Sequence, residues 1–203
     1  MNVIIIDYGM GNLSSVLRAF QECGASAEIS DNPLDLKKAT HIVLPGVGAF
    51  PDGINNLRER KFDQAIEHIV ADGIPLLGIC LGMQLLADTG YEVRKSDGLG
   101  LISGEVKKLD EAAGVRIPHV GWNEVNYKKE DSLFTNIPDN SDFYFVHSYH
   151  FEPSSESVIV GITPYGQGFV SVVRKDNVMG VQFHPEKSSQ LGFRIIRNFL
   201  DIN

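Results

Sequence analysis

The sequence is short of several features that would place it in other protein classes. It has two cysteines, Cys23 and Cys80, and no C-x-x-C pair, so it predicts neither a disulfide scaffold nor a cysteine-based zinc site. Its 18 basic residues form no cluster and are outnumbered by 26 acidic ones, which argues against nucleic-acid and anionic-membrane binding. The longest apolar stretch, around residues 74–87, contains Pro75 and Gln84 and is too short to span a membrane.

Signals for export and for several domains are also lacking. The N-terminus has no basic region before its short apolar block, so we expect a cytoplasmic protein. No repeat, low-complexity tract or linker divides the 203 residues. With 43% hydrophobic residues the chain can bury one substantial core. We therefore predict a single domain over residues 1–203.

The hydrophobic pattern changes halfway along the chain. The first half alternates strands and helices at the spacing of βαβ units, and from Ser103 onward short strand patterns follow one another until a final helix. This order predicts an α/β fold: a doubly wound, mostly parallel sheet with helices on both faces, joined to a mixed or antiparallel β-rich portion. The predicted strands cover residues 3–6, 27–30, 41–44, 74–79, 105–109, 115–117, 123–127, 143–146, 158–162, 169–174 and 178–183. The predicted helices cover residues 13–20, residues 62–70, the segment from Leu81 to about Thr89, and residues 191–200.

The segment Gly78-Ile79-Cys80-Leu81-Gly82 has the pattern of an exposed nucleophile. It lies where a buried strand is predicted to turn sharply into a helix, and the glycines permit the close packing that such an elbow requires. A thiol at the first turn of a helix is favoured in its thiolate form by the helix dipole and the unpaired N–H groups. For this motif alone, a buried structural cysteine between two packing glycines is the alternative.

A thiol nucleophile needs a base, and His184 is the best placed of the six histidines. It follows the last predicted strand, and in an extended segment Glu186 would point the same way and orient the imidazole ring. A strand-ending histidine beside an incidental glutamate is the alternative, and a metal site is disfavoured because no third ligand is evident. N–H donors for an oxyanion are offered by the turn Pro45-Gly46-Val47-Gly48 together with Leu81.

The turn Gly9-Met10-Gly11 permits a different interpretation. A strand, this glycine pair, a helix and then Ser30-Asp31 imitate a dinucleotide-binding fingerprint. Ser14 occupies the place of the third glycine, which weakens the match. A non-catalytic nucleotide-binding module therefore remains as an alternative in which the candidate triad is coincidental.

Several separated motifs together resemble one family. G-I-C-L-G-M-Q around Cys80, the P-G-V-G-A-F turn, and H-P-E-K-S near the C-terminus resemble the class I, or triad, glutamine amidotransferases over essentially the whole chain. The motifs D-Y-G-M-G-N, H-V-G-W-N and F-V-H-S-Y are similar to those of the glutaminase subunits in this family that serve histidine biosynthesis.

The resemblance implies a glutaminase that hydrolyses L-glutamine through Cys80, His184 and Glu186 without a cofactor or metal. Cys80 would attack the carboxamide carbon, and His184 would pass a proton to the departing ammonia. It also implies an oxyanion hole made by Val47, Gly48 and Leu81. The substrate glutamine would be held by Gly48, Gln84, Glu92, Ser148 and Tyr149.

The resemblance further implies a partner. In the family the ammonia is used by a separate (β/α)₈ cyclase subunit, which a chain of 203 residues cannot also contain. The two subunits would form a heterodimer, and we expect the Pro45–Gly48 turn to be mis-set for catalysis until the partner binds its substrate. A paralogous glutaminase that feeds a cyclase-like partner in surface-polysaccharide modification would share these motifs. The candidates for the partner interface are Trp122, Asn123, Tyr144 and Lys187.

Overall fold

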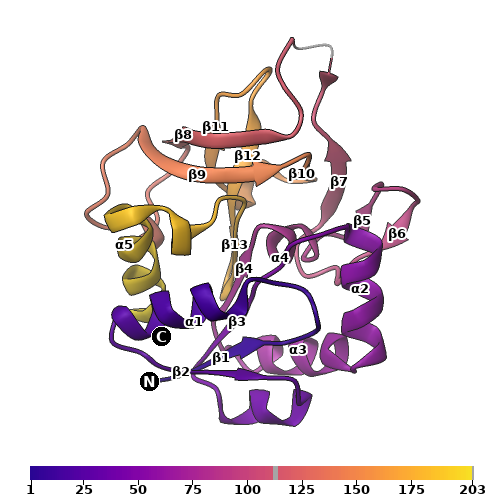
Figure 1. The fold of residues 1–203 in the computed structure, drawn as a ribbon, viewed down its shortest axis with the longest axis vertical. Coiled ribbons are helices and arrows are strands. Elements are labelled where there is room, and N and C mark those ends of the chain that lie inside the picture. Colours follow the sequence, from indigo (N-terminus) through magenta and orange to yellow (C-terminus); the bar gives the residue numbers. More distant parts are fainter. Residues whose placement is uncertain (112–113, 203) are drawn as a thin grey trace.

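A computed structural model describes residues 1–111 and 114–202 of the chain, and within them the largest element is a nine-stranded mixed sheet (Figure 1). Its first five strands are parallel: β2 (Ser26–Ser30), β1 (Asn2–Ile6), β3 (His41–Leu44), β4 (Leu76–Ile79) and β13 (Val178–Val181). The next four are antiparallel: β12 (Phe169–Lys175), β11 (Ile159–Thr163), β8 (His119–Tyr127) and β9 (Ser141–His147). This order confirms the predicted joining of a parallel portion to an antiparallel one.

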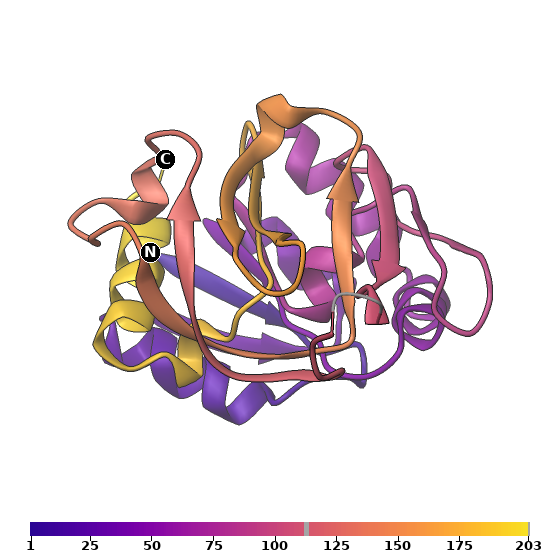
Figure 2. The same ribbon diagram turned by 90° about the horizontal axis from the view of Figure 1, so that it is seen from above.

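A smaller sheet of four strands lies beside the antiparallel portion. Its order is β10 (Tyr149–Pro153), β7 (Gly104–Lys108), β5 (Thr89–Gly90) and β6 (Ser96–Asp97). From above, the β8–β9 pair curves along one side of the molecule, between α5 (Ser189–Leu200) and this second sheet (Figure 2). Only Ser148 separates the end of β9 from the start of β10, so the chain passes between the two sheets at that residue.

Helices cover both faces of the parallel strands, because alternate residues of a strand point to opposite faces. Val3 and Ile5 of β1 pack in one core with α1 (Leu13–Glu22) and α5. Ile4 and Ile6 pack in the other core with α2 (Phe50–Glu59) and α3 (Phe62–Ala71). Burial on both faces explains why β1 is almost wholly apolar. The short helical elements are η1 (Pro33–Lys38), α4 (Leu81–Gln84), η3 (Ser132–Phe134), η4 (Glu156–Val158) and η5 (Pro185–Lys187).

The helix after Cys80 is shorter than predicted, because it ends at Gln84 rather than near Thr89. The apolar residues 85–87 are buried, which made them resemble one face of a longer helix. Their carbonyl groups instead accept hydrogen bonds from residues 99–102, so the backbone leaves the helical path there. Thr89 belongs to strand β5.

Several further elements differ from prediction. Residues 115–117 are not a strand; the next residue, Pro118, has no N–H to extend a ladder. Helix α2 was not predicted because it contains Pro51 and Gly53, yet Pro51 lies in its first turn, where proline is tolerated. The strands β5, β6 and β10 of the smaller sheet were also missed. No helix in the described ranges has both the length and the apolar character needed to cross a membrane.

Candidate active site

Cys80 occupies the sharp turn between β4 and α4. Its backbone has φ 55° and ψ −111°, a left-handed conformation that is strained for a residue with a side chain. The flanking glycines are required by space: a Cβ on Gly78 would lie 2.7 Å from the carbonyl oxygen of Gly82, and one on Gly82 would lie 1.8 Å from that of Leu44. The strand-to-helix elbow predicted around Cys80 is therefore present, with the thiol at the start of α4.

His184 reaches the same edge of the sheet from the neighbouring strand. β13 runs parallel to β4 with Val181 beside Ile79, and the N–H of Cys80 donates to the carbonyl of Val181 at 2.8 Å. Parallel strands end at the same edge, so the residues that follow them meet there. Cys80 and His184 consequently line one cavity of about 470 Å³.

Glu186 binds His184, although not in the way the sequence suggested. The His184 Nδ1 atom lies 2.8 Å from Glu186 Oε1, and both side chains are almost completely buried. The expectation of an extended H-P-E segment was wrong, because residues 185–187 form the short helical turn η5. This turn carries the carboxylate back to the imidazole, so a compact backbone achieves the contact.

The electrostatics of this pair favour a charged imidazole. Burial alone would lower the pKa of His184, but the Cys80 sulfur and the Glu186 carboxylate together raise it to about 10. The second ring nitrogen, Nε2, is buried and has no hydrogen-bond partner in the described part of the chain, and neither has Glu186 Oε2. A buried base with one nitrogen held and the other unpartnered is arranged to exchange a proton beside the sulfur.

The Pro45–Gly48 turn borders the cavity next to Cys80. Val47, Gly48 and Leu81 all line it, and Gly48 has φ 106°, which favours glycine. Within residues 1–111 and 114–202, no acceptor takes the N–H groups of Val47, Gly48 or Leu81. These groups are therefore available as donors to a ligand in the cavity.

The D-Y-G motif supports this turn from beneath. The fully buried Tyr8 donates its hydroxyl hydrogen to the carbonyl of Pro45 at 2.8 Å. Burial raises the pKa of Tyr8, and the Cys80 sulfur raises it further, so the hydroxyl stays a donor. A Cβ on Gly46 would lie 2.4 Å from the Tyr8 oxygen. The segment after β1 thus supports, through Tyr8, the turn that borders the cavity. This contact gives the D-Y-G motif a role that the dinucleotide interpretation does not require.

The five residues predicted to hold the substrate all border this cavity: Gly48, Gln84, Glu92, Ser148 and Tyr149. Glu92 reaches it from the segment between β5 and β6, with its Oε2 accepting the N–H of Phe50 at 2.7 Å at the start of α2. The pKa of Glu92 is raised above its ordinary value, chiefly by burial. The Phe50 N–H opposes this shift, and the charge of Asp52 adds to it. The Nε2 atom of Gln84 is engaged by Tyr149 and Gln182, which leaves its carbonyl oxygen for a ligand. The substrate roles of these residues stay predictions.

Two buried residues at the site were not predicted. Gln182 Nε2 lies 3.6 Å from Cys80 Sγ, and a glutamine inside an otherwise apolar strand run was the available signal. His147 lines the cavity, and its Nδ1 lies 2.9 Å from the carbonyl of Tyr149. Its Nε2 lies 3.0 Å from Nδ1 of His119. Burial lowers the pKa of His119 to about 4 and, as the largest of several causes, that of His147 to about 3.

Three of the four interface candidates lie together, with the half-buried Tyr144 between the exposed Trp122 and Lys187. Trp122 on β8 pairs with Tyr144 on β9, with ring centroids 6.1 Å apart, and Lys187 Nζ lies 5.8 Å from the Tyr144 ring. The Trp122 side chain is 54% exposed, so it is not packed beneath a loop. Asn123 is different, because its Nδ2 atom lies 3.3 Å from the buried His119 Nε2, so its side chain is directed inward.

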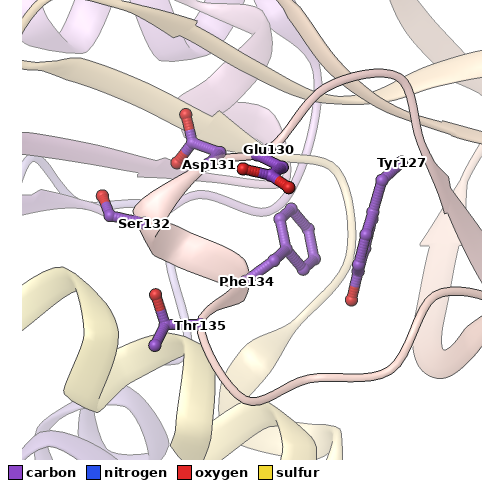
Figure 3. A pocket seen from close by; sticks show the side chains of 6 residues that line it. All are labelled: Tyr127, Glu130, Asp131, Ser132, Phe134 and Thr135. Carbon is purple, nitrogen blue, oxygen red and sulfur yellow. The ribbon is translucent and has the colours of Figure 1, made fainter.

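A second hollow, also of about 470 Å³, lies along residues 127–135 (Figure 3). The rings of Tyr127 and Phe134 face each other with centroids 4.2 Å apart. Asp131 is paired with Arg174 at 3.0 Å, and the Tyr127 hydroxyl donates to the carbonyls of Ile137 and Pro138. The described residues that line it include neither a cysteine nor a histidine, so this hollow does not compete as an active site.

Comparison with known proteins places this geometry in context. Residues 4–202 match the family model described as glutamine amidotransferase class-I. The imidazole glycerol phosphate synthase subunit HisH of Moorella thermoacetica is 47% identical over 197 residues, which cover 97% of this chain and 93% of that protein. Subunit HisH 1 of the same synthase from Campylobacter jejuni is 46% identical over 198 residues, covering 97% and 98%.

Solved structures share the fold at lower sequence identity. PurLQS from Thermotoga maritima has a TM-score of 0.78 at 20% identity, covering 98% of this chain and 97% of that one. A glutamine amidotransferase from the same organism has a TM-score of 0.66 at 21% identity, covering 99% and 83%. These similarities confirm the predicted fold.

Proposed function

Because the chain belongs to the class-I glutamine amidotransferase family, we propose that it hydrolyses glutamine to glutamate and ammonia for imidazole glycerol phosphate synthesis in histidine biosynthesis. The observation that carries this proposal is the convergence of Cys80 and His184 from adjacent parallel strands on one cavity, with His184 held by Glu186 at 2.8 Å. The curated relatives that cover nearly all of the chain are subunits of this synthase.

The reaction proceeds through a thioester. The Cys80 thiolate attacks the carboxamide carbon of glutamine and forms a C–S bond, while the carbonyl oxygen becomes an oxyanion. The C–N bond then breaks as His184 gives its proton to the departing nitrogen, which leaves as ammonia. Water next adds to the thioester carbon, giving one proton to His184. The C–S bond breaks, which restores the thiolate and the imidazolium and releases glutamate.

The cavity wall supplies the other requirements. The free N–H groups of Leu81 and, once the Pro45–Gly48 turn has reoriented, of Val47 and Gly48 donate to the oxyanion, and one such donor contributes on the order of 10²–10³-fold in rate in other acyl-transfer enzymes. The Glu92 carboxylate binds the ammonium group of the substrate. The Gln84 carbonyl oxygen, Ser148 and the backbone of Tyr149 bind its remaining polar groups.

The ammonia passes to a (β/α)₈ cyclase subunit in a heterodimer. What supports this proposal is the cluster of exposed Trp122, half-buried Tyr144 and exposed Lys187, which is joined to the site because the carbonyl of Tyr144 accepts the N–H of His184 at 2.9 Å. A large aromatic side chain left exposed beside an active site is typical of an interface anchor. Gly48 in its left-handed conformation gives the Pro45–Gly48 turn freedom to reorient its peptide groups when the partner binds substrate.

The test is to mix the chain with the cyclase subunit, glutamine and the phosphoribulosyl precursor, and to assay imidazole glycerol phosphate. Product is expected with the wild type and not with Cys80→Ala. If glutamine is hydrolysed without product, the acceptor is a different one, as in a paralogous glutaminase of sugar modification. If glutamine is not hydrolysed under any of these conditions, the glutaminase function is wrong. Full glutaminase activity in the isolated chain would contradict the gating role of the Pro45–Gly48 turn.

Replacing the anchor tests the docking face. Trp122→Ala is expected to weaken binding of the cyclase subunit by about 2–3 kcal/mol, the usual cost of truncating a buried aromatic hot spot, as measured by calorimetry. Leu34→Ala, which removes a 65% exposed apolar side chain on η1, is the matched control and should leave the affinity unchanged. Equal affinities for the two variants would exclude this face from the interface.

A further inference from the structure

Gln182 lies beside the nucleophile as a consequence of strand register. Val181 pairs with Ile79, so the residues that follow them, Gln182 and Cys80, are neighbours at the ends of two parallel strands. Gln182 is completely buried, and its Nε2 atom lies 3.6 Å from Cys80 Sγ. A buried amide in contact with a reacting sulfur is not required for packing, because an apolar side chain would fill the same space without a desolvation cost.

The hydrogen-bond network fixes which end of this amide faces the sulfur. The carbonyl of Tyr149 can only accept, so the atom of Gln84 that lies 2.8 Å from it is the donor Nε2. The same nitrogen lies 3.0 Å from the Gln182 side chain and donates to it, so the atom that receives this bond is Oε1. The amino end of Gln182 is therefore turned toward Cys80.

An N–H donor in this place discriminates between the two forms of the sulfur. A thiolate accepts a charge-assisted hydrogen bond, whereas a neutral thiol is a weak acceptor. Besides the His184 imidazole, the sulfur also has the carbonyl of Val146 as a polar neighbour at 3.9 Å, which accepts only from the protonated thiol. Burial by itself favours the thiol, and a fixed N–H donor adds to the His184 cation in opposing this effect.

We propose that Gln182 is a catalytic residue that binds the Cys80 thiolate through its amide N–H, and that Gln84 is a positioning residue that orients this amide. The proposal rests on the glutaminase function proposed above and deepens it by adding a donor to the nucleophile. It also gives Gln84 a task in the absence of substrate, because its two N–H groups are committed to the protein and not to glutamine.

The experiment measures alkylation of Cys80 by iodoacetamide against pH, with mass spectrometry to separate the two thiols. Gln182→Met keeps the length and burial of the side chain and removes the donor. The rate at Cys80 at neutral pH should fall about tenfold, the value of one hydrogen bond to a charged group, and the alkylation midpoint should move to higher pH. Cys23, at the end of α1 beside α5, is not a lining residue of the cavity; it is an internal reference and should react as before.

A second variant tests the orienting contact, and a third provides the control. Gln84→Met should also slow alkylation of Cys80, by less than Gln182→Met, because the donor remains but is no longer fixed. Gln190→Met, on the exposed side of α5, should change nothing. An unchanged pH profile of Cys80 in Gln182→Met would overturn the proposal. Parallel changes at Cys80 and Cys23 would also overturn it, because they would show a packing role.

These outcomes are independent of the glutaminase assay. Alkylation requires neither glutamine nor the partner, so the profile of Cys80 reports only on the sulfur. A changed profile in Gln182→Met together with absent glutamine hydrolysis in the wild type would overturn the proposed function and the catalytic role with it. An unchanged profile together with normal glutamine hydrolysis would overturn the inference alone.

Discussion

His184 and His147 are both buried and line the same cavity, yet near neutral pH the imidazole of His184 is positively charged and that of His147 is neutral. The pKa of His184 is raised to about 10 against the effect of burial, by Cys80 and Glu186. The pKa of His147 is lowered to about 3, chiefly by burial, and the Tyr149 carbonyl opposes this only in part. Burial alone predicts a neutral imidazole. The comparison teaches that two anionic neighbours are sufficient to reverse that prediction for one of them.

The different surroundings correspond to different tasks. His184 keeps one nitrogen unpartnered beside the sulfur, as a proton carrier must. His147 uses both nitrogens: Nδ1–H donates to Tyr149, so Nε2 accepts from Nδ1–H of His119. His119 Nε2 in turn accepts from Asn123. This neutral chain holds the backbone at the junction of β9 and β10, where the predicted substrate residues Ser148 and Tyr149 lie.

Removing the sulfur of Cys80 should reduce the difference in pKa between His184 and His147 more than any other change. In Cys80→Ala, His184 loses one of the two neighbours that favour its cation while its burial remains, so its pKa should fall below about 10, and glutaminase activity should be lost. NMR titration of ¹⁵N-labelled histidine side chains measures this shift. The pKa of His147 should stay low in the same spectra, because burial is its largest cause and the charge of His184 a smaller one. A His184 that still titrates near 10 would show that Cys80 does not set its charge.

Removing the charge of the second neighbour should have a smaller effect. Glu186→Gln keeps an acceptor for His184 Nδ1–H but no longer stabilises the imidazolium, so we expect kcat of glutamine hydrolysis to fall about 10²-fold, within the range given by positioned acid–base groups. Glu156→Gln, at an exposed carboxylate on η4, is the matched control. Equal kcat values for the two variants would mean that the anion at Glu186 is not needed.

The buried neutral histidine should be visible in the pH dependence of stability. His147 has a lower pKa in the folded chain than in the unfolded one, so the unfolded state takes up its proton first and stability is lost as the pH falls below about 6.5. Between pH 7 and pH 5 this costs about 2 kcal/mol for one histidine. His147→Gln should remove that loss, as measured by urea unfolding at both pH values.

A control variant at His68 and the pH dependence expected of His184 test this interpretation of His147. His68→Gln, on the exposed part of α3, should keep the acid sensitivity of the wild type. Since the pKa of His184 is raised, its contribution to stability is present below about pH 6.5 and is lost as the pH rises through about 10. His147, together with His119, should therefore contribute to the acid end of the stability profile and His184 to the alkaline end. An unchanged acid slope in His147→Gln would show that His147 is not the neutral group inferred here.

The parts of the site that could be predicted are those with local determinants. The Cys80 elbow depends on two glycines within five residues, because the requirement is a backbone conformation and a close approach at one turn. The pairing of His184 with Glu186 was also predicted, but for the wrong reason, since a helical turn and not an extended segment joins them. Two positions of separation in sequence limit the distance between the His184 and Glu186 side chains, but they do not define the backbone conformation that joins them.

The parts that could not be predicted join residues far apart in the chain. Gln182 and Cys80 are 102 positions apart, and only the parallel register of β13 with β4 makes them neighbours. The early end of α4 has a similar origin, because carbonyl groups that a helix would use are taken by residues 99–102. A buried apolar run has the same appearance in sequence whether it is a helix or a turn enclosed by another segment.

The sequence by itself determined the change from alternating strands and helices to a β-rich second half, the elbow that presents the thiol, and the kinds of chemical group available, because these follow from local backbone preference and from the alternation of apolar residues. Only the tertiary structure decided which groups meet the sulfur and which histidine is charged. Charge state depends on the distance to other charges and on exclusion of water, and both are properties of the folded arrangement rather than of neighbouring positions in the chain.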